Sequence, residues 1–283
     1  MTLSEIKIQF QEQLSDLYSK SETEALFSIF GEHFLNLNKI ALRNGLENDL
    51  SESDAKRFLD SIAELKTGKP FQQILGETEF FGLKFFVNEH VLIPRPETEE
   101  LLELAIAKIQ ETGIKSQAIK ILDLGTGSGI IPVVLKNYFP EAEVTAIDIS
   151  KDALDIASKN AAFHNTAINF VNRDYLNADL EEIYDVIISN PPYIGIEENP
   201  EIEVSVKGFE PNLALFSPTS DALIFYRKIA QDCQKHLVVN GLLFLEINQK
   251  LGNETLELYQ DGFSKVELLK DISGNDRMIF GRK

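Results

Sequence analysis

The residues Asn190, Pro191, Pro192 and Tyr193 join an amide, two prolines and an aromatic ring directly after an apolar run. Proline has no backbone N–H and fixes φ, and it holds the residue before it in extended conformations. This stretch therefore offers carbonyl acceptors without competing donors, and the Asn190 side chain adds another carbonyl. Two acceptors on a stiff frame suit an NH2 group, so the motif predicts a site that holds a planar nitrogen.

A glycine-rich loop occurs upstream, in the stretch ILDLGTGSGII. Asp123 stands at the end of an apolar run, and Gly125, Gly127 and Gly129 follow it. Glycines at these places allow a tight turn and a close approach of the backbone to a ligand. An acidic residue beside the loop disfavours phosphate and favours an ammonium group. The pattern D-x-G-x-G-x-G resembles the S-adenosylmethionine loop of class I methyltransferases.

Three further side chains follow later apolar runs. Asp148 lies 23 positions after Gly125, where an acid can accept hydrogen bonds from both ribose hydroxyls of an adenosine. Asp174 and Tyr175 follow the next run and are candidates to bind the adenine amino group and to pack on the adenine ring. The alternatives are a helix N-cap for Asp148 and an ordinary core position for Tyr175.

The nitrogen that such a site holds is a weak nucleophile, because its lone pair is delocalised. Two acceptors on its N–H bonds aim the nitrogen at a methyl group and favour a tetrahedral geometry, which is catalysis by positioning and electrostatics. Tyr193 is expected to stack on the flat substrate group and to face the cationic sulfonium. A carboxylate has no N–H to donate, so the site is expected to accept Gln and to reject Glu. The alternative is a strand-ending turn with a packed tyrosine.

Strands and helices alternate after residue 118. The expected strands are 119–124, 143–148, 168–172, 184–189, 241–247, 264–270 and 277–281, and the expected helices lie near 130–138, 151–163, 220–236 and 249–260. Such alternation predicts a parallel sheet with helices on both faces, whose ligands bind at the carboxyl ends of the strands. All the motifs above follow such ends.

The chain before this sheet predicts a different architecture. Residues 1–75 have apolar side chains at helical spacing and two capping signals, at Ser21 to Glu24 and at Ser51 to Asp54. Residues 76–96 alternate and are rich in aromatic residues, which predicts a β-hairpin linker. The expected fold is α/β, with a small N-terminal helical bundle, this linker, and a Rossmann-like seven-stranded class I methyltransferase domain over residues 97–283.

The totals exclude several classes of protein. The formal net charge of −18 argues against an enzyme that grips duplex DNA, because such proteins carry a basic face. This charge is interpreted either as a solubility feature or as steering toward a basic partner. One cysteine, four scattered histidines, no apolar leader and no membrane-length apolar run predict a cytoplasmic protein without a metal site.

The stretch FFGLKFFVNEHVLIPRPETEELLE, residues 80–103, resembles a signature of the peptide-chain release factor glutamine methyltransferases, the HemK/PrmC-type family. The segments NPPYI and FEPNLAL and the layout of the whole chain are similar to that family too. The resemblance implies transfer of a methyl group from S-adenosylmethionine to the side-chain amide nitrogen (N5) of the Gln in the Gly-Gly-Gln motif of class-1 release factors. It implies a release factor as the partner of the N-terminal helices, with no membrane and no direct nucleic acid binding.

The resemblance also implies where the ligands bind. The cofactor contacts are expected from Asp123, Gly125, Thr126, Gly127, Ser128, Gly129, Asp148, Asp174, Tyr175 and Asn190. The substrate glutamine is expected to contact Asn190, Pro191, Pro192 and Tyr193. Arg95 to Glu99 either cover the cofactor or brace the hairpin, and no role is assigned to Glu246.

Other functions remain as alternatives. One is methylation of a glutamine in another protein, and a second is a DNA adenine N6-methyltransferase. The second would need a target-recognition segment, and the sheet uses up the roughly ninety residues after the Asn-Pro-Pro-Tyr motif. A protein that only binds the cofactor would not need that motif, and Ile130 replaces the third glycine of a nicotinamide-binding fingerprint.

Overall fold

The computed structural model describes residues 1–112, 119–194 and 208–283. The chain divides into two compact units. One comprises Met1–Glu77 together with Gly208 and Phe209, and the other comprises the remaining described residues from Thr78 to Lys283. Each unit has a hydrophobic core of its own.

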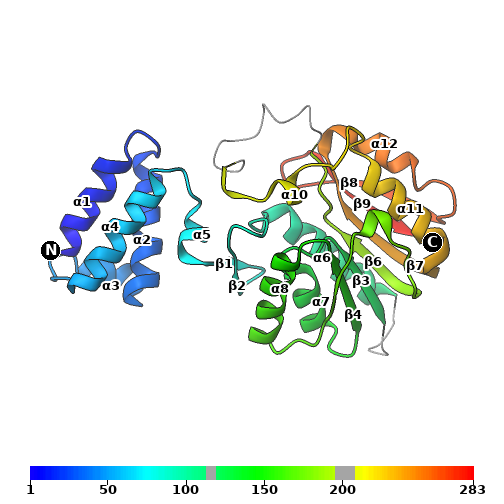
Figure 1. Cartoon of the computed structure of the whole chain (residues 1–283), viewed down its shortest axis with the longest axis horizontal. Coiled ribbons are helices and arrows are strands. Elements are labelled where there is room, and N and C mark those ends of the chain that lie inside the picture. Colours follow the sequence, from blue (N-terminus) through cyan, green and yellow to red (C-terminus); the bar gives the residue numbers. More distant parts are fainter. Residues whose placement is uncertain (113–118, 195–207) are drawn as a thin grey trace. The chain divides into compact units, whose positions relative to one another are not determined.

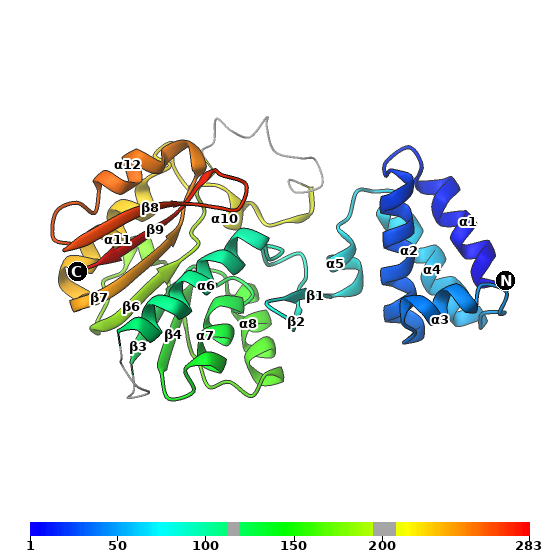
Figure 2. The same cartoon turned by 180° about the vertical axis from the view of Figure 1, so that it is seen from behind.

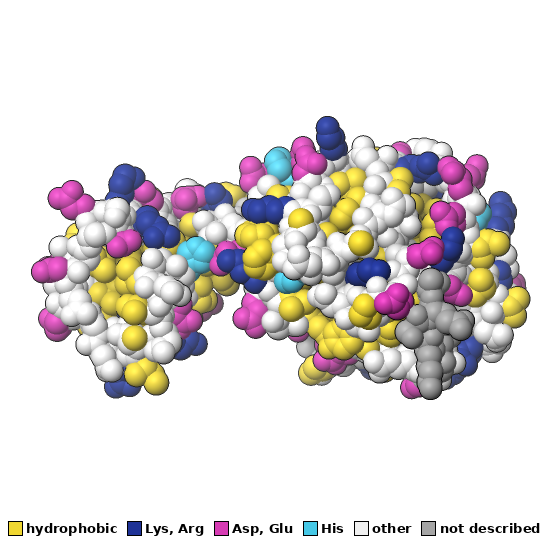
Figure 3. Space-filling model, turned by 90° about the horizontal axis from the view of Figure 1, so that it is seen from below, with side chains coloured by type: hydrophobic (Ala, Val, Ile, Leu, Met, Phe, Trp, Pro, Cys, Tyr) yellow, Lys and Arg dark blue, Asp and Glu magenta, His cyan; other side chains and the backbone are white. Residues whose placement is uncertain are grey.

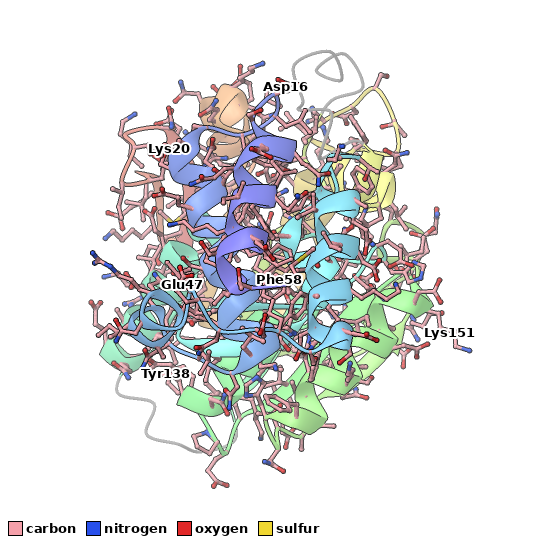
Figure 4. All side chains as sticks on the ribbon, turned by 90° about the vertical axis from the view of Figure 1, so that its left-hand side faces the viewer. Asp16, Lys20, Glu47, Phe58, Tyr138 and Lys151 are labelled. Carbon is pink, nitrogen blue, oxygen red and sulfur yellow. The ribbon has the colours of Figure 1, made fainter. Side chains whose placement is uncertain are left out.

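The first unit is a bundle of helices. Its helices are α1 (Leu3–Leu14), α2 (Lys20–Leu35), α3 (Lys39–Asn44), α4 (Glu52–Leu65) and α5 (Phe71–Leu75). Phe10, Phe27 and Phe58 pack together in its core, with ring centroids 5.9 to 6.4 Å apart. Figure 4 shows Phe58 between the helices, whereas the charged Glu47 lies at the edge of the bundle. The apolar spacing of the sequence therefore predicts this core correctly.

One of the two capping predictions is wrong. The cap of α2 is Ser19, whose side chain accepts from Glu22 N while the Glu22 carboxylate accepts from Ser19 N. The box predicted from Ser21 to Glu24 lies two residues too late, because the polar run offers two overlapping Ser-x-x-Glu pairs. The second prediction is confirmed, since Ser51 caps α4 by accepting from Asp54 N.

The predicted hairpin is present as β1 (Glu77–Phe80) and β2 (Leu83–Phe86). The two turn residues between these strands have positive φ, +54° at Phe81 and +69° at Gly82. Two positive φ values are what a two-residue hairpin turn requires, because they match the twist of the strands. Phe81 is not a residue that favours this conformation, and its N–H is satisfied by a carboxylate oxygen of Glu99 at 2.5 Å.

The second unit contains a seven-stranded sheet in the order β5-β4-β3-β6-β7-β9-β8. Its strands are β3 (Lys120–Leu124), β4 (Glu143–Asp148), β5 (Asn169–Asn172), β6 (Tyr184–Ser189), β7 (Leu237–Glu246), β8 (Lys265–Lys270) and β9 (Asp276–Arg282). Its other elements are α6 (Pro96–Glu111), α7 (Ile130–Tyr138), α8 (Lys151–Phe163), η1 (Tyr175–Asn177), α10 (Asn212–Leu215), α11 (Ile224–His236), η3 (Gln249–Leu251) and α12 (Gly252–Glu257). The sheet is parallel except for β9, which pairs antiparallel with both β7 and β8.

Helices cover both faces of this sheet, as Figures 1 and 2 show. The alternation of side chains along the strands explains why. In β6, Val186 and Ile188 belong to the core beneath α6 and α7, whereas Ile187 between them belongs to the core beneath α11. A strand that is apolar on both faces is typical of a doubly wound sheet.

Three predicted elements differ in their bounds. The strand predicted at 241–247 begins earlier, at Leu237, because Leu237 already pairs with Tyr184 of β6. The helix predicted at 220–236 begins at Ile224, after a turn in which the Ser217 hydroxyl donates to the Asp221 carbonyl. The helix predicted at 249–260 is the short η3 followed by α12.

The described residues contain neither a membrane-spanning helix nor a metal-binding cluster. None of their helices has the length and apolar character needed to cross a membrane. No group of three or more His, Cys, Asp or Glu side chains among them is arranged to hold a metal ion. The one cysteine, Cys233, is buried in the core beneath α11, where burial raises the pKa of its thiol.

Candidate active site

A cavity of about 810 Å³ lies at the carboxyl ends of β3, β4 and β6. Its walls include Gly125 and Gly127 after β3, Asp148 at the end of β4, and Asn190 after β6. The order of the strands reverses between β3 and β6, and doubly wound sheets bind their ligands at such a switch point. Cavities of this size are typical of small-molecule sites.

The glycine loop adopts a conformation that requires glycine. The φ angles of Gly125, Gly127 and Gly129 are +75°, +54° and +78°, values that cost a side-chain-bearing residue energy. A Cβ on Gly129 would lie 2.9 Å from the Cβ of Ala157, so this glycine also allows α7 and α8 to pack closely. A Cβ on Gly127 would meet nothing within 4 Å, which leaves open space for a ligand.

Asp123 is fully buried, and neither of its carboxylate oxygens has a hydrogen-bond partner among the described residues. The buried hydroxyl of Thr126 in the same loop also lacks a partner among them. Burial raises the pKa of Asp123 to about 7; the nearby Thr126 hydroxyl acts in the opposite direction, and the Asp148 carboxylate adds to the rise. Buried polar groups without partners are rare, and a ligand with N–H donors would satisfy both of these residues.

Asp148 supports the loop from the end of β4. One of its carboxylate oxygens accepts from Gly127 N and the other accepts from Ser150 N, each at 2.8 Å. Each oxygen has a further lone pair for a ligand. Burial raises the pKa of Asp148, although the backbone N–H donors counteract this effect. The N-cap of α8 is Ser150, so Asp148 does not cap this helix.

Asp174 and Tyr175 line the same cavity. The Asp174 carboxylate accepts from Leu176 N at 3.1 Å and from Asn177 Nδ2 at 2.7 Å. The Tyr175 hydroxyl donates to Asp232 at 2.7 Å, and its ring belongs to the core beneath α11. Tyr175 is therefore both a core residue and a cavity residue, and its contact with adenine stays a prediction.

Asn190 lines the cavity with Pro191 and Pro192. Its Nδ2 donates to Glu246 Oε2 at 2.8 Å and to Thr98 Oγ1 at 3.1 Å. None of the described residues donates to its Oδ1. Asn190 therefore retains an acceptor, as the sequence predicts for a residue that holds an NH2 group.

Tyr193 is not one of the described residues that line the cavity. Its ring packs against the core beneath α11, and its hydroxyl donates to Glu246 Oε1 at 3.3 Å. Burial and the Glu246 carboxylate raise the pKa of this hydroxyl above its ordinary value. The predicted stacking of Tyr193 on a substrate would need its ring to be reached from the cavity, and it stays a prediction.

Two family models match the chain. The model described as the methyltransferase small domain matches residues 103–204, and the model described as the PrmC N-terminal domain matches residues 5–76. The first match includes the glycine loop, Asp148 and the Asn-Pro-Pro-Tyr motif.

Curated relatives match over nearly the whole chain. A release factor glutamine methyltransferase of Flavobacterium psychrophilum is 43% identical over 99% of this chain and 98% of its own length. A protein of the same name in Streptococcus pneumoniae is 38% identical over the same shares. The chain belongs to the release factor glutamine methyltransferase family. Its match to a methyltransferase domain agrees with that membership.

Solved structures show the same fold at low identity. The catalytic domain of hMettl16, solved in complex with the MAT2A 3′UTR hairpin 1, matches with a TM-score of 0.55 and 19% identity over 92% of this chain and 90% of its own. A methyltransferase from Pyrococcus furiosus matches with a TM-score of 0.51 and 18% identity over 82% of this chain and 99% of its own. These likenesses support the α/β methyltransferase fold.

The family-like segment Arg95 to Glu99 has several tasks. Arg95 donates at 2.5 Å to the buried carboxylate of Glu210, which also accepts from Ile93 N at 3.0 Å. Glu99 accepts from the turn of the hairpin, and Thr98 contacts Asn190. The segment thus braces the hairpin through Glu99, which was one of the two roles considered for it. It also contacts the motif after β6 through Thr98.

Sequence reasoning missed two buried residues of this methyltransferase site. Asn160 on α8 donates to Ser128 O at 2.9 Å and to Phe86 O at 3.0 Å, and its Oδ1 accepts from Phe86 N at 2.7 Å. It ties the glycine loop to the hairpin, and an asparagine inside a helix gives no signal of this. Glu246 contacts three side chains of the site. Its one signal in the sequence is that an ionisable residue is unusual at the end of an apolar strand.

Proposed function

We propose that this protein transfers a methyl group from S-adenosylmethionine to N5 of the glutamine in the Gly-Gly-Gln motif of class-1 release factors. The observation that supports this most is the state of Asn190, whose Nδ2 donates to Glu246 and Thr98 and whose Oδ1 accepts from none of the described residues. A free acceptor beside a proline carbonyl suits an amide NH2. Membership in the release factor glutamine methyltransferase family supports the same acceptor.

The residues of the cavity and of the glycine loop beside it fit this cofactor. Asp123 and Thr126, whose carboxylate and hydroxyl have no hydrogen-bond partner among the described residues, would hold its ammonium group, and Asp148 keeps lone pairs for the ribose hydroxyls. The open space at Gly127 would admit the cofactor close to the backbone, and Asp174 and Tyr175 would take the adenine. When bound, the cofactor supplies a methyl group on a positively charged sulfur.

The reaction needs the acceptor nitrogen to be held in place. Asn190 Oδ1 and the Pro191 carbonyl would each accept one N–H of the substrate amide, which orients its lone pair toward the methyl group. Both acceptors would also stabilise the positive charge that grows on this nitrogen during transfer. A glutamate side chain offers no N–H to either acceptor, so the same pair would reject it.

The experiment incubates the protein with radiolabelled S-adenosylmethionine and one acceptor at a time. The acceptors are a class-1 release factor, its Gly-Gly-Gln→Gly-Gly-Glu variant, and duplex DNA. We expect label on the release factor alone, and mass spectrometry of the labelled peptide should place the methyl group on N5 of the glutamine. Label on the variant or on DNA but not on the wild-type factor would contradict the proposal.

A further inference from the structure

Two polar side chains from distant parts of the chain, Thr98 and Glu246, meet behind Asn190. Thr98 Oγ1 donates to Glu246 Oε2 at 2.7 Å, and Asn190 Nδ2 donates to the same Glu246 oxygen at 2.8 Å. Asn190 Nδ2 also donates to Thr98 Oγ1 at 3.1 Å. Thr98 lies in the first turn of α6 and Glu246 is the last residue of β7, so the arrangement joins two elements to the motif after β6.

The donors and acceptors in this triangle permit only one orientation of the Asn190 amide. An ionised carboxylate only accepts, so the edge of the amide that faces Glu246 has to be the NH2. The Thr98 hydroxyl donates its single proton to Glu246. Its oxygen can therefore only accept a hydrogen bond from Asn190. A flipped amide would place Oδ1 against a carboxylate oxygen with no proton between them. Asn190 lines the cavity and Thr98 and Glu246 do not, so Oδ1 lies on the cavity side.

The surroundings of Glu246 allow its charge to persist. The side chain is 1% exposed, and burial raises its pKa to about 6, with Glu97 on α6 raising it as well. Thr98, Tyr193 after β6 and Arg277 on β9 act in the opposite direction. Arg277 is itself paired with Asp271, through Nε at 3.2 Å. Glu246 is thus mostly ionised at neutral pH and becomes protonated only below about pH 6.

We propose that Glu246 is a positioning residue that, with Thr98, holds the Asn190 amide oxygen toward the substrate. Its second oxygen accepts from the Tyr193 hydroxyl, so one carboxylate fixes both polar ends of the Asn-Pro-Pro-Tyr motif. The inference rests on the proposed function for its kinetic consequences, and it has a spectroscopic consequence that does not depend on that function. Selection of an amide over a carboxylate would then depend on Glu246 as well as on Asn190.

The spectroscopic test uses the ligand-free full chain with 15N-labelled asparagine. The side-chain NH2 signals of Asn190, assigned by their loss in Asn190→Ala, should shift between pH 5 and pH 8 in the wild type. The midpoint should lie near pH 6, the pKa of Glu246, and the shift should vanish in Glu246→Gln. Asn190 signals that do not respond to pH in the wild type would overturn the proposal.

The kinetic test measures kcat at saturating cofactor and saturating substrate from pH 5 to pH 8. Wild-type kcat should fall below about pH 6, and Glu246→Gln should lower kcat at pH 7.5 about tenfold and lose this acid limb, because its neutral amide can face either way. Cofactor affinity should stay within about twofold of the wild type, since Glu246 does not line the cavity. An unchanged acid limb in Glu246→Gln would overturn the proposal.

Matched variants separate positioning from a loss of stability. Thr98→Val should lower kcat and Thr98→Ser should restore it, because serine keeps the hydroxyl. Thr255→Val removes another buried helical hydroxyl, which donates to Leu251 O, and Asp185→Asn changes a carboxylate on β6 that accepts from Lys120 N; these are their only side-chain bonds among the described residues. Both controls should keep wild-type kcat and pH dependence. Equal losses in Thr98→Val and Thr255→Val would overturn the proposal.

The two proposals fail in different ways. A wild-type protein that methylates none of the acceptors, yet shows the Asn190 titration, contradicts the proposed function and supports the positioning role. An active wild type without this titration contradicts the positioning role alone.

Discussion

Asn190 is the residue on which the proposed chemistry depends most directly. Its amide is held from behind by Thr98 and Glu246, and Asn190 and Pro191 both line the cavity. A side chain held in this way loses little conformational entropy when a substrate binds, which is the purpose of a preorganised site. The residue should therefore contribute to turnover much more than to cofactor binding.

We expect Asn190→Ala to lower kcat about 100- to 1,000-fold, the usual range for loss of one preorganised hydrogen-bonding group. Isothermal titration should show S-adenosylmethionine affinity within about threefold of the wild type, because the carboxylates and the glycine loop remain. The role assignment would be wrong if cofactor binding were abolished while activity at saturating cofactor survived.

The buried carboxylate of Asp123, which is placed to bind a ligand, lowers the stability of the ligand-free protein when it is charged. Its pKa is about 7 in the folded chain, against an ordinary value of 3.8, because burial disfavours the charged form. Between pH 4 and pH 7 the folded chain thus binds more protons at this site than the unfolded chain does. The contribution of Asp123 to the free energy of unfolding consequently falls as pH rises through this window.

We expect Asp123→Asn to raise the unfolding temperature of the ligand-free protein at pH 8, corresponding to about 1–3 kcal/mol of regained desolvation energy. The gain should shrink toward pH 4, because Asp123 is neutral there in the folded chain and no longer loses hydration of a charge. The same variant should bind S-adenosylmethionine at least about tenfold more weakly, through loss of a charged partner for the ammonium. Scanning calorimetry at both pH values and isothermal titration check the two effects, and a gain of equal size at pH 4 would contradict the explanation.

At the scale of elements, the glycine loop joins β3 to α7 against the neighbouring helix α8. Gly127 and Gly129 both have positive φ. A Cβ added to Gly129 would meet Ala157 on α8, whereas a Cβ added to Gly127 would meet nothing within 4 Å. The two positions should therefore respond differently to the same substitution.

We expect Gly127→Ala to cost about 1 kcal/mol of stability from backbone strain alone. Gly129→Ala should cost about 2–5 kcal/mol, because strain is joined by a clash with Ala157. Urea unfolding of both variants measures the difference, and Gly129→Ala combined with Ala157→Gly should recover part of the loss. Equal costs for the two single variants would contradict the role of the helix contact.

Asn160 links three elements through one side chain. It bonds both backbone groups of Phe86 at the end of β2 and the Ser128 carbonyl in the glycine loop. Because Asn160 is fully buried and the groups that it bonds are buried or partly buried, removing the amide leaves them without partners.

We expect Asn160→Ala to lower the free energy of unfolding by about 2–4 kcal/mol and to weaken cofactor binding by loosening the loop. Asn160→Asp is the matched variant, since it keeps the acceptor for Phe86 N but turns a carboxylate toward two carbonyls. Its stability should improve as pH falls and the carboxyl becomes protonated. A pH-independent loss in Asn160→Asp would count against this account.

At the scale of the whole molecule, the protein pairs a helical unit with the methyltransferase unit. The formal net charge is −18, and on the face shown in Figure 3 acidic and basic side chains are interspersed. Such a surface suits recognition of a protein better than recognition of nucleic acid phosphates. The helical unit carries no candidate chemistry of its own, so we infer that it binds the body of the release factor.

Deleting residues 1–70 should then raise the KM for an intact release factor more than the KM for a short Gly-Gly-Gln peptide. The physical reason is that only the intact factor would lose contacts with the helices. Cofactor affinity of the truncated protein, measured by isothermal titration, serves as the control for folding of the second unit. An equal rise in both KM values would indicate a purely structural role for the helices.

The sequence by itself determined the elements and the places where chemistry occurs. The alternation of apolar runs predicted the strands. Asp148 at the end of β4 and Asn190 after β6 line one cavity, and Asp123 lies near the same end of β3. These features are local, because they depend on backbone preferences and on the period of side chains along one element. The cap of α2 was misplaced because two local signals overlapped.

Only the tertiary structure decided what holds these residues in place. Thr98 and Glu246 lie 92 and 56 positions from Asn190 along the chain, yet all three share hydrogen bonds. Likewise, the full burial of Asp123, whose carboxylate has no hydrogen-bond partner in the part of the chain that the structure describes, depends on the packing around β3. Side-chain contacts and desolvation depend on which residues share the same space, and a sequence pattern within one element does not contain that information.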